Sequence, residues 1–483
     1  MSIIVGRKKE QQVLEKIYRS NEAEFVVVYG RRRVGKTYLI REFFGNKKCC
    51  LFHASGLLKG TLKKQLKKFT ETISETFFDN IALEIPKNWG DAFSLLHKQI
   101  FKTNGKVIVF LDELPWMATR KSGLLQEIDY YWNKQWSKLP SVVLVVCGSS
   151  ASWLIKKIIY DKGGLHNRVT CQMRLPSFTL SEAKAYLQSR KIKLNNDHVL
   201  SLYMAFGGIP YYLRYVEPGL SADENIQKII FGLDAPLEEE FEKLFYSLFE
   251  VADAYIELIK LIAKKKIGTT RAELKSVAKL STDGGRLTER LQDLCAAGFI
   301  EEYVPWGRTT GEYYKLIDEF SIFYLHWVDS RKRNFAQDHW ITQSQRPSYY
   351  AWSGYAFEAI CMKHIKQIIK ALNIKSASTI GSWRYAPEKM KNKLENDGAQ
   401  IDLVIDRGDK SITVCEIKYT TQPFQIDKKY YETLKQKIEI FKRITETKKQ
   451  IFMAFISAAG LKKNIYSEEF IEGVATSVDL FKE

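Results

Sequence analysis

The chain has 483 residues, more than one hydrophobic core usually supports, so we expect roughly two to four domains. Hydrophobic residues make up 45% and charged residues 27%, a balance that excludes an intrinsically disordered chain and a membrane protein. The 74 lysines and arginines outnumber the 56 aspartates and glutamates by 18, which favours a polyanionic partner such as DNA, although solvated lysines on helix surfaces would give the same excess.

The sequence contains no pattern typical of a membrane span, a signal peptide or a disulfide framework. The apolar runs are strand-sized, well short of the ~20 residues of a membrane span. Arg7, Lys8 and Lys9 interrupt the start of the chain before any apolar core of signal-peptide length. Seven cysteines without CxxC spacing fit reduced thiols better than disulfides or zinc sites. We therefore expect a cytoplasmic protein with no membrane partner and no structural metal.

Apolar, strand-sized runs alternate with helical patterns in residues 1–180. The runs are 25–29, 49–53, 107–111, 142–147 and 169–175. Strands that alternate with helices predict an α/β fold with a parallel, doubly wound sheet. Helical spacing then dominates, and the breaker Gly207-Gly208-Ile209-Pro210 interrupts it, which predicts a helical lid or sensor subdomain over 181–250.

Three further parts follow in the predicted organisation. Residues 251–318 contain three helical patterns and a strand pair, the outline of a winged helix. Residues 319–350 are expected to form a helical linker, and residues 351–483 a separate α/β domain. The chain is thus predicted to end in a domain of its own after the winged helix.

The third helical pattern of the winged-helix region has two different faces. Leu287, Leu291 and Leu294 form a stripe that we expect to be buried, which leaves Arg286 and Arg290 more exposed. That exposed face could enter the major groove of DNA. The alternative is that these arginines are solvated or dock on another domain.

Residues 30–37, GRRRVGKT, match the phosphate-binding pattern GxxxxGK[ST] between a predicted strand and a predicted helix. The glycines let backbone N–H groups approach phosphate oxygens, and a helix N-terminus favours negative charge. Lys36 is expected to reach the β- and γ-phosphates and Thr37 to bind magnesium. The predicted nucleotide-binding residues of this segment are Gly30, Arg31, Arg32, Arg33, Val34, Gly35, Lys36, Thr37 and Tyr38.

A second acidic element ends the strand predicted at 107–111. Asp112 is expected to hold the magnesium through water, and Glu113 to polarise the attacking water as a general base. Binding without turnover is the alternative. Ser149, after the next strand, could sense the γ-phosphate or cap a helix. Arg168 could supply a finger-type charge to the transition state or be a surface residue.

These motifs together resemble the prokaryotic AAA-like ATPases of the STAND superclass, many of which carry a winged helix and a C-terminal nuclease-like domain. The resemblance covers nearly the whole chain. It rests on Gly6-Arg7 with Glu10 and on segments 30–37, 110–116, 147–150 and 207–212. It implies ATP as the nucleotide, with Gly6 and Arg7 near its base. Related ATPases often place an arginine of one subunit at another's nucleotide, so Arg168 could act in cis or in trans, and a homo-oligomer is one expected state.

The last domain carries Asp402 on one predicted strand and Glu416 and Lys418 on the next. Since strand side chains alternate, Glu416 and Lys418 share a face. A three-residue connection centred on Asp409 would place Asp402 opposite Glu416. A two-residue turn would place it opposite Cys415, on the wrong face, and the sequence does not fix this register.

An aspartate and a glutamate close together bind a divalent cation, and a neighbouring lysine can position the attacking water in phosphodiester cleavage. The arrangement resembles the D…ExK core of the restriction-endonuclease-like superfamily, with Glu358 at the frequent first acidic position and Lys435 and Gln436 as auxiliary candidates. This resemblance implies Mg²⁺ at Glu358, Asp402 and Glu416. A decayed domain that only binds is the alternative.

The resulting hypothesis is an ATP-hydrolysing, DNA-directed protein whose metal-dependent nuclease-like domain is gated by the nucleotide state. One rival is a switch ATPase with a non-catalytic C-terminal domain and a winged helix that regulates transcription or assembly. A second rival is an ATPase that acts on a protein partner, with the basic surface incidental.

Overall fold

The computed structural model describes residues 4–119, 122–160, 163–165, 167–277, 284–308, 310–329, 339–385 and 398–483. The chain divides into two compact units. The first comprises residues 1–178, 209–211 and 292–298, and the second comprises 179–208, 212–291 and 299–483. Within the described ranges, no helix is long and apolar enough to cross a membrane.

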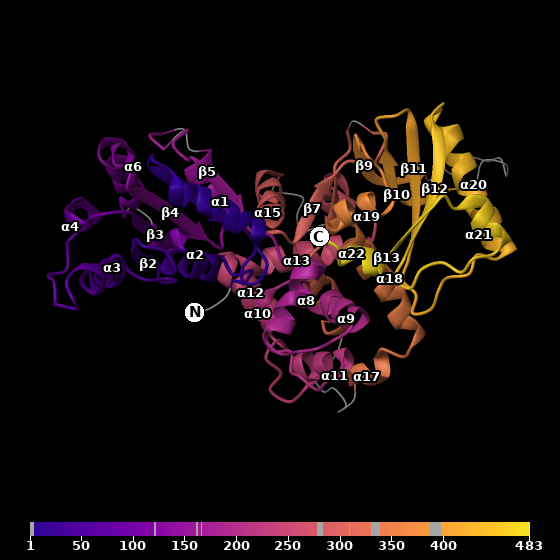
Figure 1. The fold of residues 1–483 in the computed structure, drawn as a ribbon, viewed down its shortest axis with the longest axis horizontal. Helices are drawn as coiled ribbons and strands as arrows, with labels where there is room; N and C mark the ends of the chain where they lie inside the picture. The colour runs from indigo at the N-terminus through magenta and orange to yellow at the C-terminus, as the bar shows by residue number, and fades with distance from the viewer. Residues whose placement is uncertain are drawn as a thin grey trace. The chain divides into compact units, whose positions relative to one another are not determined.

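The first unit is built on a parallel sheet of five strands in the order β2-β3-β4-β1-β5 (Figure 1). In chain order its elements are α1 (Lys8–Arg19), β1 (Glu24–Tyr29), α2 (Lys36–Gly45), β2 (Cys50–Ser55), α3 (Leu62–Phe77), α4 (Trp89–Lys102), β3 (Val107–Asp112), α5 (Leu114–Met117), α6 (Leu124–Lys134), β4 (Val142–Gly148), α7 (Ala151–Leu154) and β5 (Cys171–Arg174). The predicted parallel α/β sheet is confirmed.

The central strands of this sheet are apolar on both faces because helices cover both. Every residue of β3 and β4 is buried, as expected for a parallel sheet between two helical layers. On one face, Phe69 of α3 and Trp89 and Phe93 of α4 join one core cluster with Phe52 of β2 and Phe25 of β1. This core holds the strand ends in place, and the loops that follow those ends carry the phosphate site.

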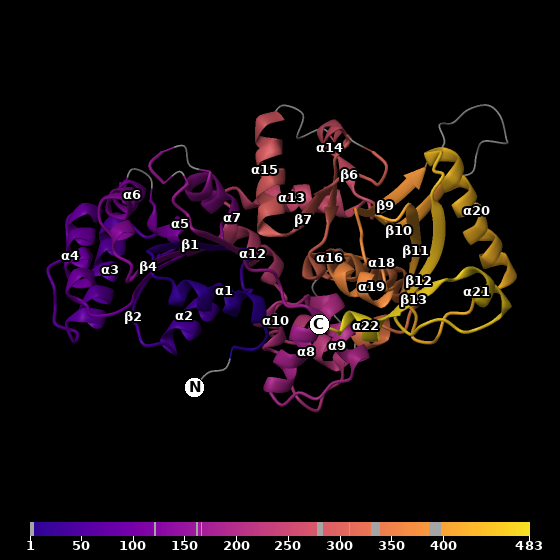
Figure 2. The same ribbon diagram turned by 45° about the horizontal axis from the view of Figure 1, so that its top comes forward.

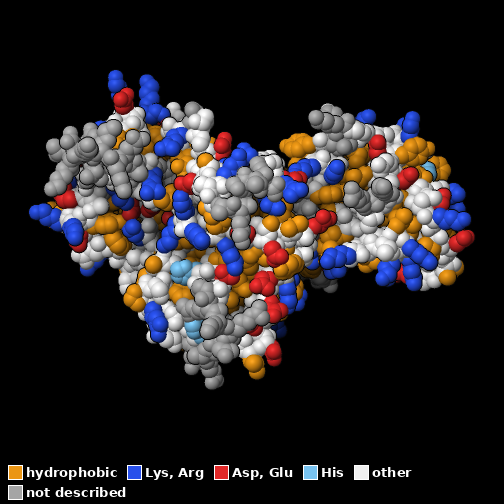
Figure 3. Space-filling view, turned by 180° about the vertical axis from the view of Figure 1, so that it is seen from behind, with side chains coloured by type: hydrophobic (Ala, Val, Ile, Leu, Met, Phe, Trp, Pro, Cys, Tyr) orange, Lys and Arg blue, Asp and Glu red, His pale blue; other side chains and the backbone are white. Residues whose placement is uncertain are grey.

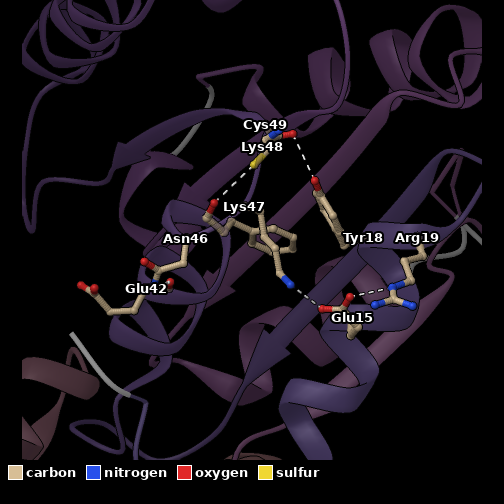
Figure 4. Close-up of polar contacts among 9 residues, drawn as sticks. Glu15, Tyr18, Arg19, Glu42, Asn46, Lys47, Lys48 and Cys49 are labelled. Atoms are coloured by element: carbon tan, nitrogen blue, oxygen red, sulfur yellow. Dashed lines mark hydrogen bonds and ion pairs between the residues drawn. The ribbon is translucent and has the colours of Figure 1, made fainter. Parts of the chain in front are cut away.

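Polar contacts tie α1 to the end of α2 (Figure 4). Glu15 accepts from Lys47 at 2.6 Å and from Arg19 at 2.6 Å, and the hydroxyl of Tyr18 donates to the carbonyl of Lys48 at 3.1 Å. The hydrogen bonds from Lys47 and Arg19 lower the pKa of Glu15. The helix that follows Gly6 and Arg7 is therefore fastened to the helix that follows the phosphate loop.

The second unit begins with helices and a small sheet. Its first elements are α8 (Leu180–Ser189), α9 (Asn196–Phe206), α10 (Pro210–Leu213), α11 (Ala222–Ile226), α12 (Glu240–Leu248), α13 (Ala252–Ala263), β6 (Thr269–Thr270), α14 (Arg271–Ser276), α15 (Gly284–Ala297), β7 (Ile300–Tyr303) and β8 (Tyr313–Leu316). The start of α10 and the last part of α15 are counted with the first unit. Strands β6, β8 and β7 form an antiparallel sheet in that order. Leu287, Leu291 and Leu294 of α15 are buried and Arg286 is exposed, as predicted.

The remainder of the second unit ends in a mixed sheet of the order β13-β12-β11-β10-β9 (Figure 2). Its elements are α16 (Glu319–Trp327), α17 (His339–Gln343), α18 (Pro347–Lys363), α19 (Ile365–Ala371), β9 (Thr379–Tyr385), β10 (Ala399–Asp406), β11 (Ser411–Lys418), α20 (Lys428–Thr445), β12 (Gln450–Ser457), α21 (Ile465–Phe470), β13 (Gly473–Thr476) and α22 (Ser477–Leu480). Leu434 and Phe441 of α20 share a core cluster with Ile412 and Val414 of β11 and Phe455 of β12.

The register of the β10–β11 hairpin decides which side chains of the two strands face each other. Leu403 pairs with Cys415 and Asp406 with Ile412, so the connection has the three-residue form centred on Asp409. Continuing this register by one residue puts Asp402 opposite Glu416. Of the two alternatives left open by the sequence, the first is therefore correct.

The connection between β7 and β8 packs into the core of the C-terminal sheet. The backbone N–H of Trp306 donates to the carbonyl of Ser382 at 3.0 Å, and its ring lies 5.2 Å from that of Phe441. Gly381 faces Trp306, and a Cβ atom at Gly381 would make an ordinary van der Waals contact with that residue. The small sheet and the C-terminal sheet thus share apolar packing inside the second unit.

His364 joins α18 to the start of α8. Its Nε2 accepts from the backbone N–H of Leu180 at 3.0 Å, which leaves the proton on Nδ1 to donate to the carbonyl of Ile360 at 2.9 Å. The side chain is buried, and this burial lowers the pKa of His364 from 6.5 to about 4. The imidazole is therefore neutral in the folded protein.

We predict that the second unit loses stability as the pH falls from 6.5 towards 4, because His364 then takes up a proton in the unfolded chain but not in the folded one. At 1.36 kcal/mol per pKa unit the loss is roughly 3 kcal/mol. Urea unfolding of the wild type and of His364→Gln over this range measures it. The slope of stability against pH should be shallower in the variant, and equal slopes would contradict the assignment.

Candidate functional site

The phosphate loop follows β1 and requires glycine at its first position. Gly30 has φ +144°, and a Cβ there would lie 2.3 Å from the carbonyl oxygen of Leu175, just beyond β5. Gly35 has φ +92° and precedes the first turn of α2. Two positions of the GxxxxGK[ST] pattern are thus glycine for backbone reasons, one steric and one conformational.

Lys36 and Thr37 lie where the sequence predicts, at the first turn of α2. The buried ammonium group of Lys36 donates to the carbonyl oxygens of Gly30 at 3.1 Å and Arg31 at 3.0 Å. The hydroxyl of Thr37 donates to Oδ2 of Asp112 at 2.8 Å. The structure therefore brings together the two motifs that were identified separately, and it offers the hard hydroxyl and carboxylate oxygens that suit Mg²⁺.

Asp112 is a buried carboxylate at the end of β3. Burial would raise its pKa, but interactions with His53 and Thr37 outweigh that and hold the pKa of Asp112 below its ordinary value. Nε2 of His53 lies 3.6 Å from Oδ2. Asp112 is therefore ionised at neutral pH, as a group that is to hold a cation must be.

Glu113 is held by Ser149. The backbone of Glu113 is left-handed, with φ 47°, and Oε2 accepts from both the backbone N–H and the hydroxyl of Ser149 at 2.9 Å each. Helix α7 begins after Ser150, whose side chain makes no capping hydrogen bond. Ser149 therefore positions the Glu113 carboxylate instead of capping a helix, a link between strand ends that the sequence did not indicate.

Gly6 and Arg7 lie against the phosphate loop. Arg7 is buried, donates from Nη2 to the carbonyl of Val34 at 3.2 Å, and stacks its guanidinium 4.5 Å from the ring centroid of Phe178. Gly6 takes the left-handed conformation, with φ 65°. Tyr38, the residue after Thr37 on α2, is exposed. The predicted nucleotide-binding residues at the start of the chain are thus next to the loop in space.

The three arginines inside the loop have different environments. Arg31 is buried, Arg32 stacks its guanidinium 5.2 Å from the ring centroid of Trp116, and Arg33 lies 4.1 Å from that of Tyr211. Arg33 also takes a left-handed backbone, with φ 72°. Trp116 and Tyr211, from two of the segments that carry the resemblance to AAA-like ATPases, are therefore packed on the phosphate loop.

Arg168 is not brought to the phosphate loop of its own chain. It is exposed and precedes β5, whose first residue, Cys171, pairs with Val26 near the start of β1. The loop follows the opposite end of β1, so Arg168 belongs to the other edge of the sheet. Arg174, which pairs with Tyr29, is the arginine of β5 at the loop edge. The cis role considered for Arg168 is not supported by this geometry, and a trans role stays a prediction.

A second candidate site lies on β10 and β11 of the second unit. Asp402 accepts from the backbone N–H of Ile417 at 3.0 Å through Oδ2. Burial together with the nearby charges of Glu416 and Glu358 raises the pKa of Asp402 to about 7. The predicted acidic residues are therefore near enough for their charges to interact, and a cation among them would relieve that repulsion.

Glu416 is buried and surrounded by donors. Oε1 accepts from the hydroxyl of Tyr430 at 2.7 Å and lies 2.9 Å from Nζ of Lys418, and Oε2 lies 2.7 Å from Nζ of Lys437. Burial would raise the pKa of Glu416, but Lys418 and Lys437 hold it below its ordinary value. Glu416 is therefore charged and paired.

The auxiliary residues on α20 differ from those expected. Lys437 and Tyr430 contact Glu416, whereas Lys435 stacks on the ring of Tyr431, 5.1 Å from its centroid. Lys435 does not contact Glu416 because it is two helical positions from Lys437, and about 200° of rotation turns its side chain to another face of α20. Tyr430 and Lys437 are seven residues apart, two turns on one face, so helical spacing counted from a predicted strand partner could have found them.

Glu358 completes the predicted acidic set from α18. Its Oε1 lies 3.0 Å from Nζ of Lys315 on β8. In the part of the chain that the structure describes, no three His, Cys, Asp or Glu side chains are grouped so as to hold a metal ion. The carboxylates of Glu358, Asp402 and Glu416 are thus neighbours that are partly neutralised by lysines, not a gathered set of three ligands.

A cleft of about 550 Å³ opens beside Asp402. One wall comes from α18 and from strands β9, β10 and β11, and it includes Glu358, Asp402 and Lys418. The other wall comes from the residues after α13 and from β7 and β8, and it includes Lys266 and Lys315. The candidate acidic residues therefore face a space large enough for a ligand.

Residues 4–216 match a family model described as an ATPase domain predominantly from Archaea. The matched region contains the phosphate loop, the Asp112 and Glu113 pair and Ser149. This part of the chain is a P-loop ATPase domain. Residues 324–437 match a second model, described as archaeal and bacterial proteins of unknown function. That match covers α18 and the strands with Asp402 and Glu416.

Relatives include two proteins of Methanocaldococcus jannaschii. An uncharacterized protein is 24% identical over 450 residues, 91% of this chain and 92% of the relative. An uncharacterized ATP-binding protein is 50% identical over 46 residues, 10% of this chain and 78% of the relative. Among solved structures, the Walker-type ATPase of Pyrococcus abyssi matches with a TM-score of 0.49 and 16% identity over 67% of this chain and 96% of the other. The ORC2 protein of Aeropyrum pernix matches with a TM-score of 0.44 and 13% identity over 74% and 95%.

We predict that Gly30→Ala weakens ATP binding to the ATPase domain by about tenfold or more, because the new Cβ would displace the loop from Leu175 and ~1.4 kcal/mol of strain is enough for that factor. Isothermal titration calorimetry measures the affinity. Gly45→Ala is the matched control, since it has open space around its Cβ position at the end of α2. Equal losses in the two variants would show that the steric explanation is wrong.

Proposed function

We propose that the ATPase domain hydrolyses ATP and that its nucleotide state controls metal-dependent cleavage of nucleic acid by the C-terminal sheet of the second unit. The observation that carries the second part is the common cleft that Glu358, Asp402 and Lys418 line. The first part rests on the Thr37–Asp112 bond and on the position of Glu113.

In the hydrolytic step, Lys36 binds the phosphates and Glu113 accepts the proton of the attacking water. Lys36 has to exchange its bonds to the Gly30 and Arg31 carbonyls for phosphate oxygens. Mg²⁺ held at Thr37 and Asp112 would supply positive charge to the phosphates. The hydroxyl of Ser149 donates to the Glu113 carboxylate and fixes its position. In the reaction, the attacking water replaces this hydroxyl as the donor to Glu113.

Glu113→Gln should lower the rate of ATP hydrolysis by about 10²–10⁴-fold, because an amide accepts the Ser149 hydrogen bonds but cannot act as the base. ATP affinity should stay near the wild-type value. Phosphate release and nucleotide titration measure the two quantities, and Glu71→Gln on the surface of α3 is the control. Unchanged hydrolysis in Glu113→Gln would remove this residue from the mechanism.

In the C-terminal domain the chain's own groups support hydrolysis of a phosphodiester. Burial would lower the pKa of Lys418, but Glu416 raises it above its ordinary value, so the side chain is a charged ammonium. A phosphate oxygen would be a second partner for it beside Glu416. Asp402 and Glu358 provide hard oxygen ligands beside it. A divalent cation bound there would activate water and stabilise negative charge.

DNA is the proposed polyanion. The order α13, β6, α14, α15, β7, β8, with β8 between β6 and β7, is that of a winged helix, a module that commonly binds DNA. Its β7–β8 connection is packed on the C-terminal sheet through Trp306, and the exposed Arg286 near the start of α15 is the side chain proposed for groove contacts. In Figure 3, lysine and arginine side chains are interspersed with acidic ones over the face drawn, so net charge adds little to this inference.

A second candidate function is a switch ATPase whose C-terminal domain binds without cleaving. The contacts of Glu416 with Lys418, Lys437 and Tyr430 favour it, as does the Lys315–Glu358 pair, because a metal ion would have to displace lysines that already neutralise its ligands. Such a domain would keep its fold and lack turnover.

The two candidates are separated by a cleavage assay with labelled DNAs, with magnesium or manganese, and with and without ATP. We expect wild-type cleavage to be abolished by Asp402→Asn and altered by Lys36→Ala. Glu439→Gln, an exposed residue of α20, should behave as wild type. Absence of cleavage in every condition, with ATP hydrolysis intact, would favour the switch ATPase.

A further inference from the structure

We propose that the cleft beside Asp402 takes an unpaired strand of nucleic acid, so that the substrate of the C-terminal domain is single-stranded or has an unpaired end. This inference rests on the proposed nuclease function and adds its substrate class. It is carried by the size of the cleft, by the aromatic side chains that line it and by the distribution of its basic residues.

The volume of the cleft suits one strand of nucleic acid better than a duplex. Its volume of about 550 Å³ lies in the range of pockets that hold one small ligand, about 300–1,000 Å³. The major groove of a duplex is by itself about 12 Å wide. A short stretch of one strand fits such a space, and Asp402 is on its lining. The volume of the cleft therefore favours a single strand over a duplex as the occupant beside Asp402.

Aromatic side chains line the cleft on both walls. Tyr350 and Tyr355 come from α18, Tyr303 from β7, and Tyr419 follows β11. Tyr350 is 53% exposed, and its edge-to-face contact with Tyr349 orients the ring, with centroids 5.9 Å apart. Exposed rings beside basic groups are the platforms on which proteins stack unpaired bases, and paired bases in a duplex cannot reach them.

The basic residues of the cleft come from different elements and outnumber the acidic ones. The lining has Lys266, Lys315, Arg384 and Lys418 against Glu358 and Asp402. Lys266 and Arg384 are exposed, one on each wall. Lys266 follows α13 and also donates to the carbonyl of Ala351 at 3.3 Å, next to Tyr350. Cations on both sides suit a backbone that passes between the walls.

The packing between the two walls keeps the cleft narrow. The hydroxyl of Tyr303 donates to the carbonyl of Ile267, within the wall formed by the small sheet. Trp306 on the same side bonds to Ser382 and stacks near Phe441, which fastens that wall to the C-terminal sheet. Separating the two walls would require this apolar contact to break.

The test measures binding with the full-length chain carrying Asp402→Asn, so that the probe is not consumed. The probes are a fluorescent oligodeoxynucleotide of about 16 nucleotides and a blunt duplex of the same sequence, in magnesium, followed by anisotropy. We expect the single strand to bind at least about tenfold more tightly. Equal or tighter binding of the duplex would overturn the inference.

Variants assign this binding to the cleft. Tyr350→Ala should weaken single-strand binding by about fivefold or more, since stacking of one base is worth at least that factor. Tyr130→Ala is the matched control, because Tyr130 is also 53% exposed and also makes an edge-to-face contact, with Tyr131, on α6 of the first unit. Thermal midpoints equal to that of the parent chain establish that both variants fold. Equal binding by the two variants would overturn the inference.

The basic residues are tested by salt dependence. Arg384→Ala should reduce the slope of log affinity against log salt by roughly 0.7 on the single strand, the value for one lost phosphate contact. Arg443→Ala, exposed on α20 and outside the cleft, should leave the slope unchanged. An unchanged slope in Arg384→Ala would show that the strand does not pass Arg384, which would contradict the proposed path through the cleft.

Failure of the inference and failure of the proposed function give different results. If the wild-type chain cleaves blunt duplex and spares single strands, the nuclease proposal stands and the substrate class is wrong. If no DNA is cleaved but the single strand binds through Tyr350, the cleft is a binding site and the nuclease proposal is wrong. Cleavage of single strands that is lost in Tyr350→Ala supports both.

Discussion

A buried carboxylate must be compensated by donors, and this requirement shapes both sites of the chain. Asp112 and Glu416 are each almost fully buried at the end of a strand. An uncompensated charge at such a position costs several kcal/mol, so the fold has to bring donors from elsewhere. Thr37 at the start of α2 meets Asp112, and Lys437 and Tyr430 of α20 meet Glu416. In each case polar contacts to a buried carboxylate hold the helix on the sheet, in addition to apolar packing.

The sequence predicted what depends on local pattern. The strand runs, the glycines of the phosphate loop and the buried stripe Leu287, Leu291 and Leu294 follow from periodicity and backbone requirements within a few residues. For the β10–β11 hairpin, the sequence is compatible with two registers and does not distinguish between them. The choice lies in the turn itself, where Asp409 accepts from the backbone N–H of Ser411 and closes the three-residue connection.

The contacts that the sequence did not predict join residues that are far apart in the chain. Ser149 bonds to Glu113 across 36 positions, and Arg168 lies at the edge of the sheet away from the phosphate loop because β5 runs parallel to β1. Neither follows from a motif, since a motif states which residue types occur and not which strand ends they reach. The sequence pattern indicates Lys435, whereas Lys437 contacts Glu416, because the pattern does not fix which face of α20 is turned towards the strand.

One of the points at which the chain passes between the two units lies between Tyr211 and Tyr212. Tyr211 packs within the first unit, under the guanidinium of Arg33 in the phosphate loop. The next residue, Tyr212, packs within the second unit, where its hydroxyl donates to the buried carboxylate of Glu240 at 2.9 Å. Tyr211 and Tyr212 are consecutive residues of α10, so the chain passes from one unit to the other within this helix.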